Sequence, residues 1–325
     1  MPKKASNRVP ATLKPPTFVP PGGISLAMQG RNSHAEVQPL NFIALDIETS
    51  SPPDAVVERV VAKRLLERAA DDDEDETAAT SPENITTIKA AINFLVAQWQ
   101  PPKSVTKQET IDAKREEYRE SLTSKAENLR EKSALFDEAP IVCIGACGFE
   151  GLVVFDAMRT GGPVVENGVA VIKCGSERDM LVKFRDWLDI QAAPPSDTTA
   201  GTALIGFNIL GFDLPKLRGR YMKHGLKPPL ALRTGDGEKL NTVIDIMKTF
   251  LNFCTVDFRS RKMIAFEKVL DHLGLPNYKK GVNGAQVPEM HKKKRFAEIV
   301  RYNAIDVHGE FAAWALMSGQ GQSLS

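Results

Sequence analysis

The sequence predicts an α/β fold, a sheet flanked by helices, and three observations lead to this prediction. Short apolar runs with the character of inner strands alternate with amphipathic helical patterns along most of the chain. The hydrophobic content of 42% and the charged content of 26% are those of an ordinary soluble globular protein. The 325 residues are also enough for one large domain or two modest ones.

The alternation begins with a strand, a hairpin and a helix. Residues 40–47 form an apolar run that we interpret as a buried central strand. Residues 141–148 and 152–155 are two further strand-like runs, and the short segment 149–151 between them predicts a hairpin. Residues 176–190 open with polar and acidic side chains and continue with apolar ones at helical spacing. This pattern predicts a capped amphipathic helix.

The alternation continues toward the C-terminus. Residues 202–207 predict another inner strand, and residues 214–224 predict a helix with proline in its tolerated first turn. Residues 242–246 predict a short strand, and residues 264–273 predict a helix that ends before a glycine. The last predicted element is a long helix over residues 294–317.

A long segment between the first two predicted strands interrupts this alternation. Residues 56–66 are amphipathic and are followed by an acidic run over residues 71–76. Residues 81–83 predict the start of a second helix. Residues 106–109 predict a capping box at the start of a third. We therefore interpret residues 52–138 as a helical insertion. A solvated helical arm explains it as well as a partner-binding or substrate-clamping role.

We expect four regions along the chain. Residues 1–38 form a flexible, Pro-rich basic tail, which we favour over an organelle transit peptide because the prolines oppose an amphipathic helix. Residues 39–51 and 139–318 form the α/β domain, and residues 52–138 form its insertion. Residues 319–325 form a C-terminal tail.

Charge and cysteine content narrow the class of protein. The formal net charge of +1 gives no overall attraction to nucleic acid, so any electropositive groove must be local. The four cysteines form no Cys-x-x-Cys pair and no histidine cluster accompanies them, which argues against zinc and for reduced thiols in a cytoplasmic compartment. No apolar stretch approaches the ~20 residues of a membrane span, so we expect no membrane association.

Acidic residues in three separated segments have the spacing of a divalent-metal site. Asp46 and Glu48 lie two residues apart at the end of a strand, so both carboxylates project to the same side. Tyr302 and Asp306 lie four residues apart on the last predicted helix and are neighbours on one face. Asp213 follows an inner strand. Buried carboxylates repel one another unless a cation neutralises them, and Mg²⁺ prefers such hard oxygen ligands.

Several of these residues also have purely structural explanations. Asp213 could cap the helix that follows it. Asn208 could close the turn after the strand, or it could place its amide against a nucleotide. Phe207 and Phe212 could belong to the core or stack on bases. Asp245, at the end of a predicted strand, could border the site or be satisfied by local hydrogen bonds.

Basic residues lie between the second and third acidic segments. Lys279, Lys280 and residues 292–295 could contact phosphates, because basic side chains there would balance a polyanion. A solvated basic face explains them equally well.

The three acidic segments resemble the motifs of the DEDD exonuclease superfamily, in its tyrosine-bearing branch, DEDDy. They more closely resemble those of the 3′–5′ proofreading domain of family B DNA polymerases and its stand-alone relatives. Residues 45–49 resemble the first motif, residues 206–214 the second, and residues 302–306 the Tyr-x-x-x-Asp third motif. Arg301 stands where the histidine-bearing branch would have histidine.

The resemblance implies a ribonuclease H-like fold, a mixed sheet flanked by helices with a helical insertion between the first two strands. It covers residues 40–50 and about 139–317. The insertion departs from the compact pattern of the family, which bears on the access of substrate rather than on the chemistry.

The resemblance also implies the metal ligands. Two Mg²⁺ ions, or Mn²⁺ ions, would be held by Asp46, Glu48, Asp306 and, through water, Asp213, while Tyr302 would position the attacking water. The substrate-binding residues that we expect are Thr49, Asn208 and Phe212.

We therefore expect a metal-dependent 3′–5′ exonuclease that hydrolyses phosphodiester bonds at single-stranded DNA ends by a two-metal-ion mechanism. None of the motifs reads the 2′-hydroxyl of RNA, so a 3′–5′ exoribonuclease with the same chemistry is an alternative. An alternative of another class is a catalytically idle nucleic-acid-binding or scaffold module, against which the four retained carboxylates argue.

Overall fold

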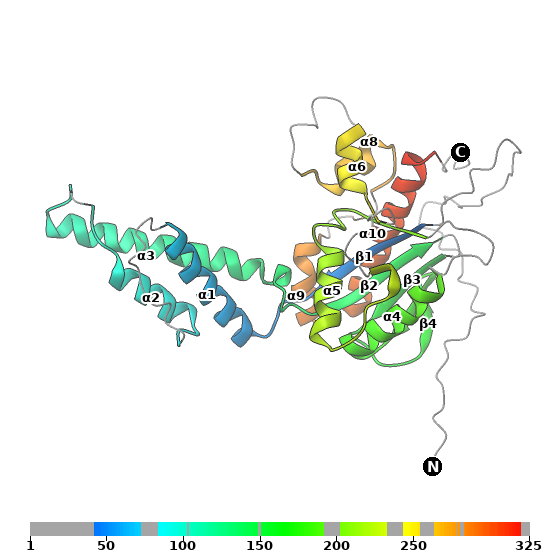
Figure 1. The fold of residues 1–325 in the computed structure, drawn as a ribbon, viewed down its shortest axis with the longest axis horizontal. Coiled ribbons are helices and arrows are strands. Elements are labelled where there is room, and N and C mark those ends of the chain that lie inside the picture. Colours follow the sequence, from blue (N-terminus) through cyan, green and yellow to red (C-terminus); the bar gives the residue numbers. More distant parts are fainter. Residues whose placement is uncertain are drawn as a thin grey trace, which may run out of the picture. The chain divides into compact units, whose positions relative to one another are not determined.

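The computed structural model (Figure 1) places the chain in two compact units, which we describe separately. The sheet unit contains residues Met1–Glu48 and Ile141–Ser325, and the helical unit contains residues Thr49–Pro140. Within these units the structure describes residues 42–72, 84–102, 104–148, 151–191, 202–232, 243–253, 263–277, 279 and 283–319. None of the helices in these ranges is long and apolar enough to cross a membrane.

The sheet unit is built on a mixed sheet. Within the described residues its strands are β1 (Phe42–Thr49), β2 (Ile141–Gly148), β3 (Gly151–Asp156), β4 (Pro163–Glu166), β5 (Val169–Lys173), β6 (Ala203–Gly206) and β7 (Val243–Asp245). Their order across the sheet is β4-β5-β3-β2-β1-β6-β7. β2 and β3 are antiparallel, while β6 runs parallel to both β1 and β7. This arrangement is an α/β fold consistent with a ribonuclease H-like domain, as the sequence predicts.

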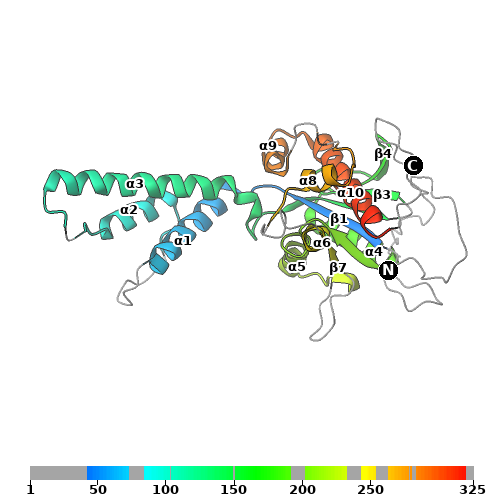
Figure 2. The same ribbon diagram turned by 90° about the horizontal axis from the view of Figure 1, so that it is seen from above.

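Helices cover both faces of the sheet. In the described stretches of this unit the helices are α4 (Glu177–Gln191), α5 (Asp213–Lys223), α6 (Ile246–Phe253), α8 (Phe266–His272), α9 (Val287–Lys292) and α10 (Phe296–Met317), with short 3-10 turns at Leu230–Leu232 and Gly284–Gln286. Side chains of α4 and α5 pack on one face of the sheet, and those of α9 and α10 pack on the other (Figure 2).

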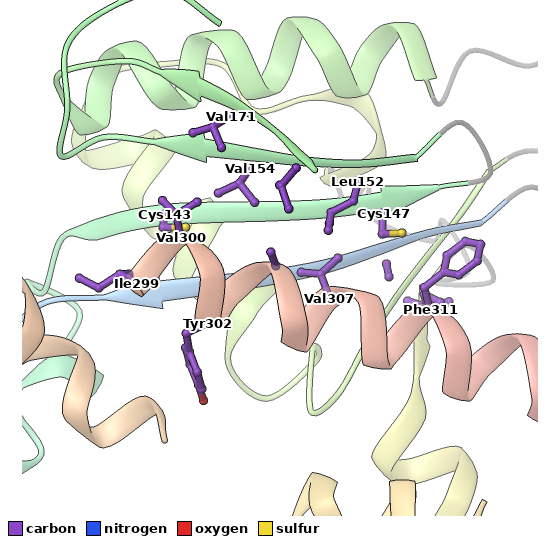
Figure 3. Close-up of a cluster of buried hydrophobic side chains, with 14 of the residues drawn as sticks. Cys143, Cys147, Leu152, Val154, Val171, Ile299, Val300, Tyr302, Val307 and Phe311 are labelled. Atoms are coloured by element: carbon purple, nitrogen blue, oxygen red, sulfur yellow. The ribbon is translucent and has the colours of Figure 1, made fainter. Parts of the chain in front are cut away.

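The alternation of side chains along β1 decides which face receives the acidic residues. Ile43 and Leu45 pack with α4 and α5, whereas Phe42 and Ala44 pack with α10. Successive strand residues point to opposite faces, so Asp46 and Glu48 continue the α10 side of β1. Figure 3 shows the cluster between α10 and the strands, with Tyr302 directed away from the strands.

A smaller apolar cluster joins the last turns of α10 to α6 and α8. Ile246 and Phe250 of α6 pack with Val269 and Leu270 of α8, and Ala313 of α10 completes the cluster. Burial of these apolar side chains anchors α6 and α8, which follow β7 in the chain, onto the same helix that carries Tyr302 and Asp306.

The helical unit has a core of its own. It contains α1 (Asp54–Asp72), α2 (Ile88–Gln98), α3 (Gln108–Glu131) and a 3-10 turn at Ser133–Leu135. Its buried cluster consists of Val57, Val60, Val61, Leu65, Ile88, Ile92, Leu95, Val96, Leu122, Ala126, Leu129 and Phe136. Glu58 ties the three helices together, because its carboxylate accepts a hydrogen bond from the Ile88 N–H at 3.0 Å and pairs with Arg130 at 2.7 Å.

The second and third helices predicted for this unit are present, but neither begins with the predicted capping residues. α2 begins at Ile88 rather than near residues 81–83, which lie outside the described residues, and Thr87 Oγ1 caps it by accepting from the Ala90 N–H at 3.3 Å. α3 begins at Gln108 with Lys107 at the N-cap position and no side-chain cap, so the predicted capping box at residues 106–109 does not form. A capping sequence gives only a local preference, and packing selects the residue at which each helix starts.

Among the described residues of the sheet unit, two strands and two α-helices were not predicted. β4 and β5 form an antiparallel pair at one edge of the sheet, and β5 also pairs in parallel with β3. α6 follows β7 directly, and α9 is a separate short helix before α10. Each spans eight residues or fewer, which is too short for periodicity to distinguish strand, helix and turn.

Candidate functional site

Three carboxylates meet where the end of β1 faces α10. Single oxygen atoms of Asp46, Glu48 and Asp306 all lie within 4.8 Å of one another. Glu48 and Asp306 are buried, while Asp46 is partly exposed. β1 supplies the first two side chains on one face, and the middle of α10 supplies the third. The structure therefore brings together residues that are 258 or more positions apart.

Asp213 reaches the same strand from another direction. It is the first residue of α5, and its Oδ1 accepts a hydrogen bond from the Ile47 N–H at 3.2 Å. Asp213 does not cap α5, which was the structural alternative expected for it. Phe212 holds the N-cap position, and the Asp213 side chain accepts a hydrogen bond from β1 instead. Asp213 is thus held beside the backbone that connects Asp46 with Glu48.

Burial and mutual repulsion disfavour the charged forms of these carboxylates. Burial and then the charge of Asp306 raise the pKa of Asp46 to about 7. Burial and the charge of Asp46 raise the pKa of Glu48 and the pKa of Asp213 well above their usual ranges. Like charges at close range cost free energy that a bound cation would relieve, and this is the electrostatic character of a metal site.

Lys279 is the basic residue placed at this cluster. Its Nζ lies 2.7 Å from Asp306 Oδ1, 3.4 Å from the Tyr302 hydroxyl and 3.7 Å from Glu267. Burial alone would lower the pKa of Lys279, but the nearby carboxylates of Asp306, Glu267 and Asp46 together outweigh burial and raise it, so the ammonium stays charged. Lys279 therefore lies in the acidic cluster and not on a solvated face, and its contact with phosphates stays a prediction.

Tyr302 lies one turn before Asp306 on α10. The phenol is buried, and burial together with the charges of Asp306 and Glu48 raises its pKa. Tyr302 therefore carries its proton at neutral pH. A protonated phenol beside carboxylates can donate one hydrogen bond and accept another, which is what orienting a water molecule requires.

Sequence reasoning missed Glu310, one turn after Asp306. Its side chain is only 3% exposed, and its Oε1 accepts a hydrogen bond from the Phe207 N–H at 2.9 Å. Its Oε2 is buried without a hydrogen-bond partner among the described residues. Burial, followed by the charges of Asp46 and Asp213, raises its pKa well above the usual range. The helical spacing from Asp306 was the signal available in the sequence.

The three residues predicted to bind substrate lie at the end of β1 and in the turn between β6 and α5. Thr49 ends β1, and its hydroxyl donates to the Ala134 carbonyl at 2.8 Å. Asn208 has a left-handed backbone with φ of 59°, and its carbonyl accepts from Gly211 and Phe212 in the turn after β6. Phe212 is partly exposed next to Asp213.

Asp245 has a local structural role. It ends β7, and its two carboxylate oxygens accept hydrogen bonds from the Leu210 N–H at 3.3 Å and from the Lys248 N–H at 3.2 Å. The first bond fixes the turn between β6 and α5, and the second caps the first turn of α6. This satisfies the carboxylate at the strand end, which was the structural explanation given for it.

The donor set fits a divalent cation with a preference for hard oxygen ligands. Asp46, Glu48 and Asp306 provide such oxygens at mutual separations that one ion can bridge. The described part of this cluster offers no cysteine or histidine ligand beside them, so softer metals are a poorer match. Their raised pKa values are those expected of ligands before a cation compensates their charge.

The fold and the site define an α/β protein whose sheet order and acidic cluster are consistent with a ribonuclease H-like exonuclease domain. Residues 191–322 match the family described as "Predicted 3'-5' exonuclease related to the exonuclease domain of PolB". The predicted resemblance is thereby confirmed for this stretch, which contains Asp213, Tyr302 and Asp306 but not Asp46 or Glu48. No curated protein matches the chain.

Proposed function

We propose that this protein is a divalent-metal-dependent 3′–5′ exonuclease that removes nucleotides from single-stranded DNA ends. The observation that carries the proposal is the convergence of Asp46, Glu48 and Asp306, from β1 and α10, on one point. The match of residues 191–322 to a predicted 3′–5′ exonuclease family supports nuclease activity. The substrate, its polarity and the number of ions are parts of the proposal.

Asp46, Glu48 and Asp306 would hold the cations, and Asp213 would support them from the start of α5. Bound divalent cations of this kind neutralise the scissile phosphate and lower the pKa of a nearby water molecule. The protein contributes a buried setting, in which the carboxylates keep a fixed geometry before substrate arrives. We favour Mg²⁺, with Mn²⁺ as a substitute, because carboxylate oxygens dominate the donor set.

Tyr302 and Lys279 supply the remaining polar groups. The protonated Tyr302 hydroxyl would orient the attacking water by a hydrogen bond. Lys279 neutralises Asp306 in the structure, and its charged Nζ would contact a phosphate oxygen of the bound nucleotide. Thr49, Asn208 and Phe212 stay our proposed contacts to the terminal nucleotides, and the partly exposed Phe212 would stack on a base.

The test is degradation of synthetic oligonucleotides by the full chain. With a 5′-labelled single strand we expect a ladder of shortening labelled products, and with a 3′-labelled strand we expect immediate release of labelled mononucleotide. Both reactions should require Mg²⁺ or Mn²⁺ and stop on chelation. Release of mononucleotide from the 5′ end instead would contradict the proposed polarity. A ribose version of the same sequence decides between DNA and RNA as the preferred substrate.

Substitution of Asp46 tests the proposed metal site most directly. We expect Asp46→Ala to lower the rate by about a hundred- to a thousandfold, because the loss of one group that stabilises transition-state charge costs about that much. The fold should be retained or slightly stabilised, since one repelling carboxylate is removed. Glu298→Gln is the matched control, because Glu298 is an exposed carboxylate of α10 paired with Arg295. Equal activity of Asp46→Ala and wild type would exclude the proposed site.

A further inference from the structure

Asn303 is a buried polar residue of α10 that the proposed chemistry leaves unexplained. It follows Tyr302 directly and has no exposed surface. Its Nδ2 donates to Asp46 Oδ2 at 2.8 Å and lies 3.3 Å from the Asp46 carbonyl oxygen. A single amide group therefore contacts both the side chain and the backbone of the residue that begins the acidic cluster.

The other side of this amide is fixed by Cys143 of β2. The Cys143 thiol donates to Asn303 Oδ1 at 3.2 Å, and Cys143 is fully buried. Burial raises the pKa of this thiol well above its ordinary value, so it keeps the proton that it donates. The two Asp46 oxygens accept from the amide nitrogen, and the thiol donates to the amide oxygen, so both contacts require the same orientation of the Asn303 amide.

Gly145 makes room for the amide. A Cβ at this position would lie 2.4 Å from Asn303 Oδ1 and 2.6 Å from Val307 Cγ2, so a side chain there would push α10 away from β2. Three neighbouring features, the donor at Cys143, the space at Gly145 and the acceptor at Asp46, thus suit an asparagine at position 303. If position 303 served only to pack the helix against the sheet, an apolar side chain would be sufficient and none of these polar contacts would be needed.

We propose that Asn303 is a positioning residue that holds the Asp46 carboxylate in a single orientation for metal binding, and that the Cys143 thiol fixes the amide of Asn303 in the required sense. An isolated carboxylate rotates freely about its last bond, whereas one bonded at Oδ2 presents Oδ1 in a defined direction. The inference about activity rests on the proposed function, but the inference about metal binding does not.

The test is calorimetric titration of MnCl₂ into the full chain without nucleic acid, at a pH above the Asp46 pKa of about 7. Loss of a group that orients a metal ligand typically weakens metal binding about 10- to 100-fold. We expect Mn²⁺ affinity to fall by this factor in Asn303→Leu, because leucine keeps the side-chain volume but makes no hydrogen bonds. Cys143→Ala should weaken binding a few-fold, about as one neutral hydrogen bond does, while Cys143→Ser keeps a donor and should bind like wild type. In the Asp46→Asn background, Asn303→Leu should cause no further loss.

Kinetics give a second measurement that a merely structural role would not affect. For Asn303→Leu we expect a lower kcat at limiting Mg²⁺ that partly recovers at high Mg²⁺, with the KM for the oligonucleotide unchanged. Wild-type Mn²⁺ affinity in Asn303→Leu would overturn the inference. If that variant does not fold, equal affinities of Cys143→Ala and wild type would overturn it instead. A wild-type protein that binds Mn²⁺ but degrades no oligonucleotide would contradict the proposed function and leave the calorimetric test intact.

Discussion

At the scale of single residues, the site concentrates buried acids with few opposing charges. Asp46, Glu48, Asp213 and Glu310 all have raised pKa values, and burial is the first cause for each. Lys279 is the cation that opposes them most closely, through Asp306. Folding therefore places these carboxylates where their charged forms are less favourable than in the unfolded chain, and a divalent cation would reverse that balance.

The raised pKa of Asp46 predicts how stability depends on pH without metal. The folded protein holds the Asp46 proton up to about pH 7, whereas the unfolded chain loses it near the ordinary value of 3.8. The native state thus binds more protons between these values, and the Asp46 contribution to the free energy of unfolding should fall as pH rises through this window and then level off. Glu48, Asp213 and Glu310 act in the same direction.

Thermal unfolding in a chelator at about pH 5 and about pH 8 measures this dependence. We expect a lower Tm at the higher pH, and recovery of Tm there on addition of excess Mg²⁺. Asp46→Asn should show a smaller change between the two pH values than wild type. A Tm that rises with pH in both proteins would contradict the assigned electrostatics.

At the scale of elements, α10 connects the three motif segments. Asn303 bonds to Asp46 at the end of β1, Asp306 joins the acidic cluster, and Glu310 accepts from Phe207 at the end of β6. These three side chains are spaced by three and four residues, so they form one stripe along the helix. Val307 and Phe311, which follow Asp306 and Glu310 directly, pack against the sheet (Figure 3).

Glu310 provides the prediction at this scale. Glu310→Gln keeps an acceptor for the Phe207 N–H and should unfold with about the wild-type free energy, because burial already favours the neutral acid. Glu310→Leu leaves that partly buried N–H unpaired and should lower the free energy of unfolding by about 1–3 kcal/mol. Urea unfolding measures both, with Glu298→Leu on the exposed face of α10 as the control. Equal losses in the Gln and Leu variants would show that the negative charge, not the acceptor, matters.

At the scale of the whole molecule, the helical unit and the sheet unit have separate cores. All buried apolar residues of the helical unit's cluster come from residues 57–136. The two ends of this unit are adjacent, because the Ser50 N–H donates to the Pro140 carbonyl at 3.0 Å. The chain therefore leaves and rejoins the sheet unit at neighbouring points, as expected of an inserted unit that folds on its own core.

Excision of residues 52–138 and their replacement by a short Gly/Ser linker tests this independence. We expect the shortened protein to keep a cooperative thermal transition and Mn²⁺ binding, because Asp46, Glu48, Asp213 and Asp306 all belong to the sheet unit. Circular dichroism and calorimetry are the measurements. Loss of cooperative unfolding would show that the sheet unit depends on the inserted helices. If the shortened protein folds, comparing its activity with that of the full chain on short and long oligonucleotides shows whether the insertion serves substrate binding.

Local patterns in the sequence were sufficient for much of the site. The apolar run before Asp46 and the spacing of two residues to Glu48 predicted a strand with both carboxylates on one face. The spacing of four residues between Tyr302 and Asp306 predicted neighbours on a helix. These are properties of a strand or helix by itself, so periodicity alone could reveal them.

Other features needed the packed structure. The hydrogen bond from Ile47 to Asp213, the position of Lys279 against Asp306, and the contact of Asn303 with Asp46 each join residues from different elements. No periodic pattern in the sequence around these residues reveals such contacts, because the contacts depend on strand order and on how closely α10 approaches β2. The sequence by itself determined which side chains share a face of each element. Only the tertiary structure decided which faces meet, because sheet order and helix packing are set by burial summed over the whole core.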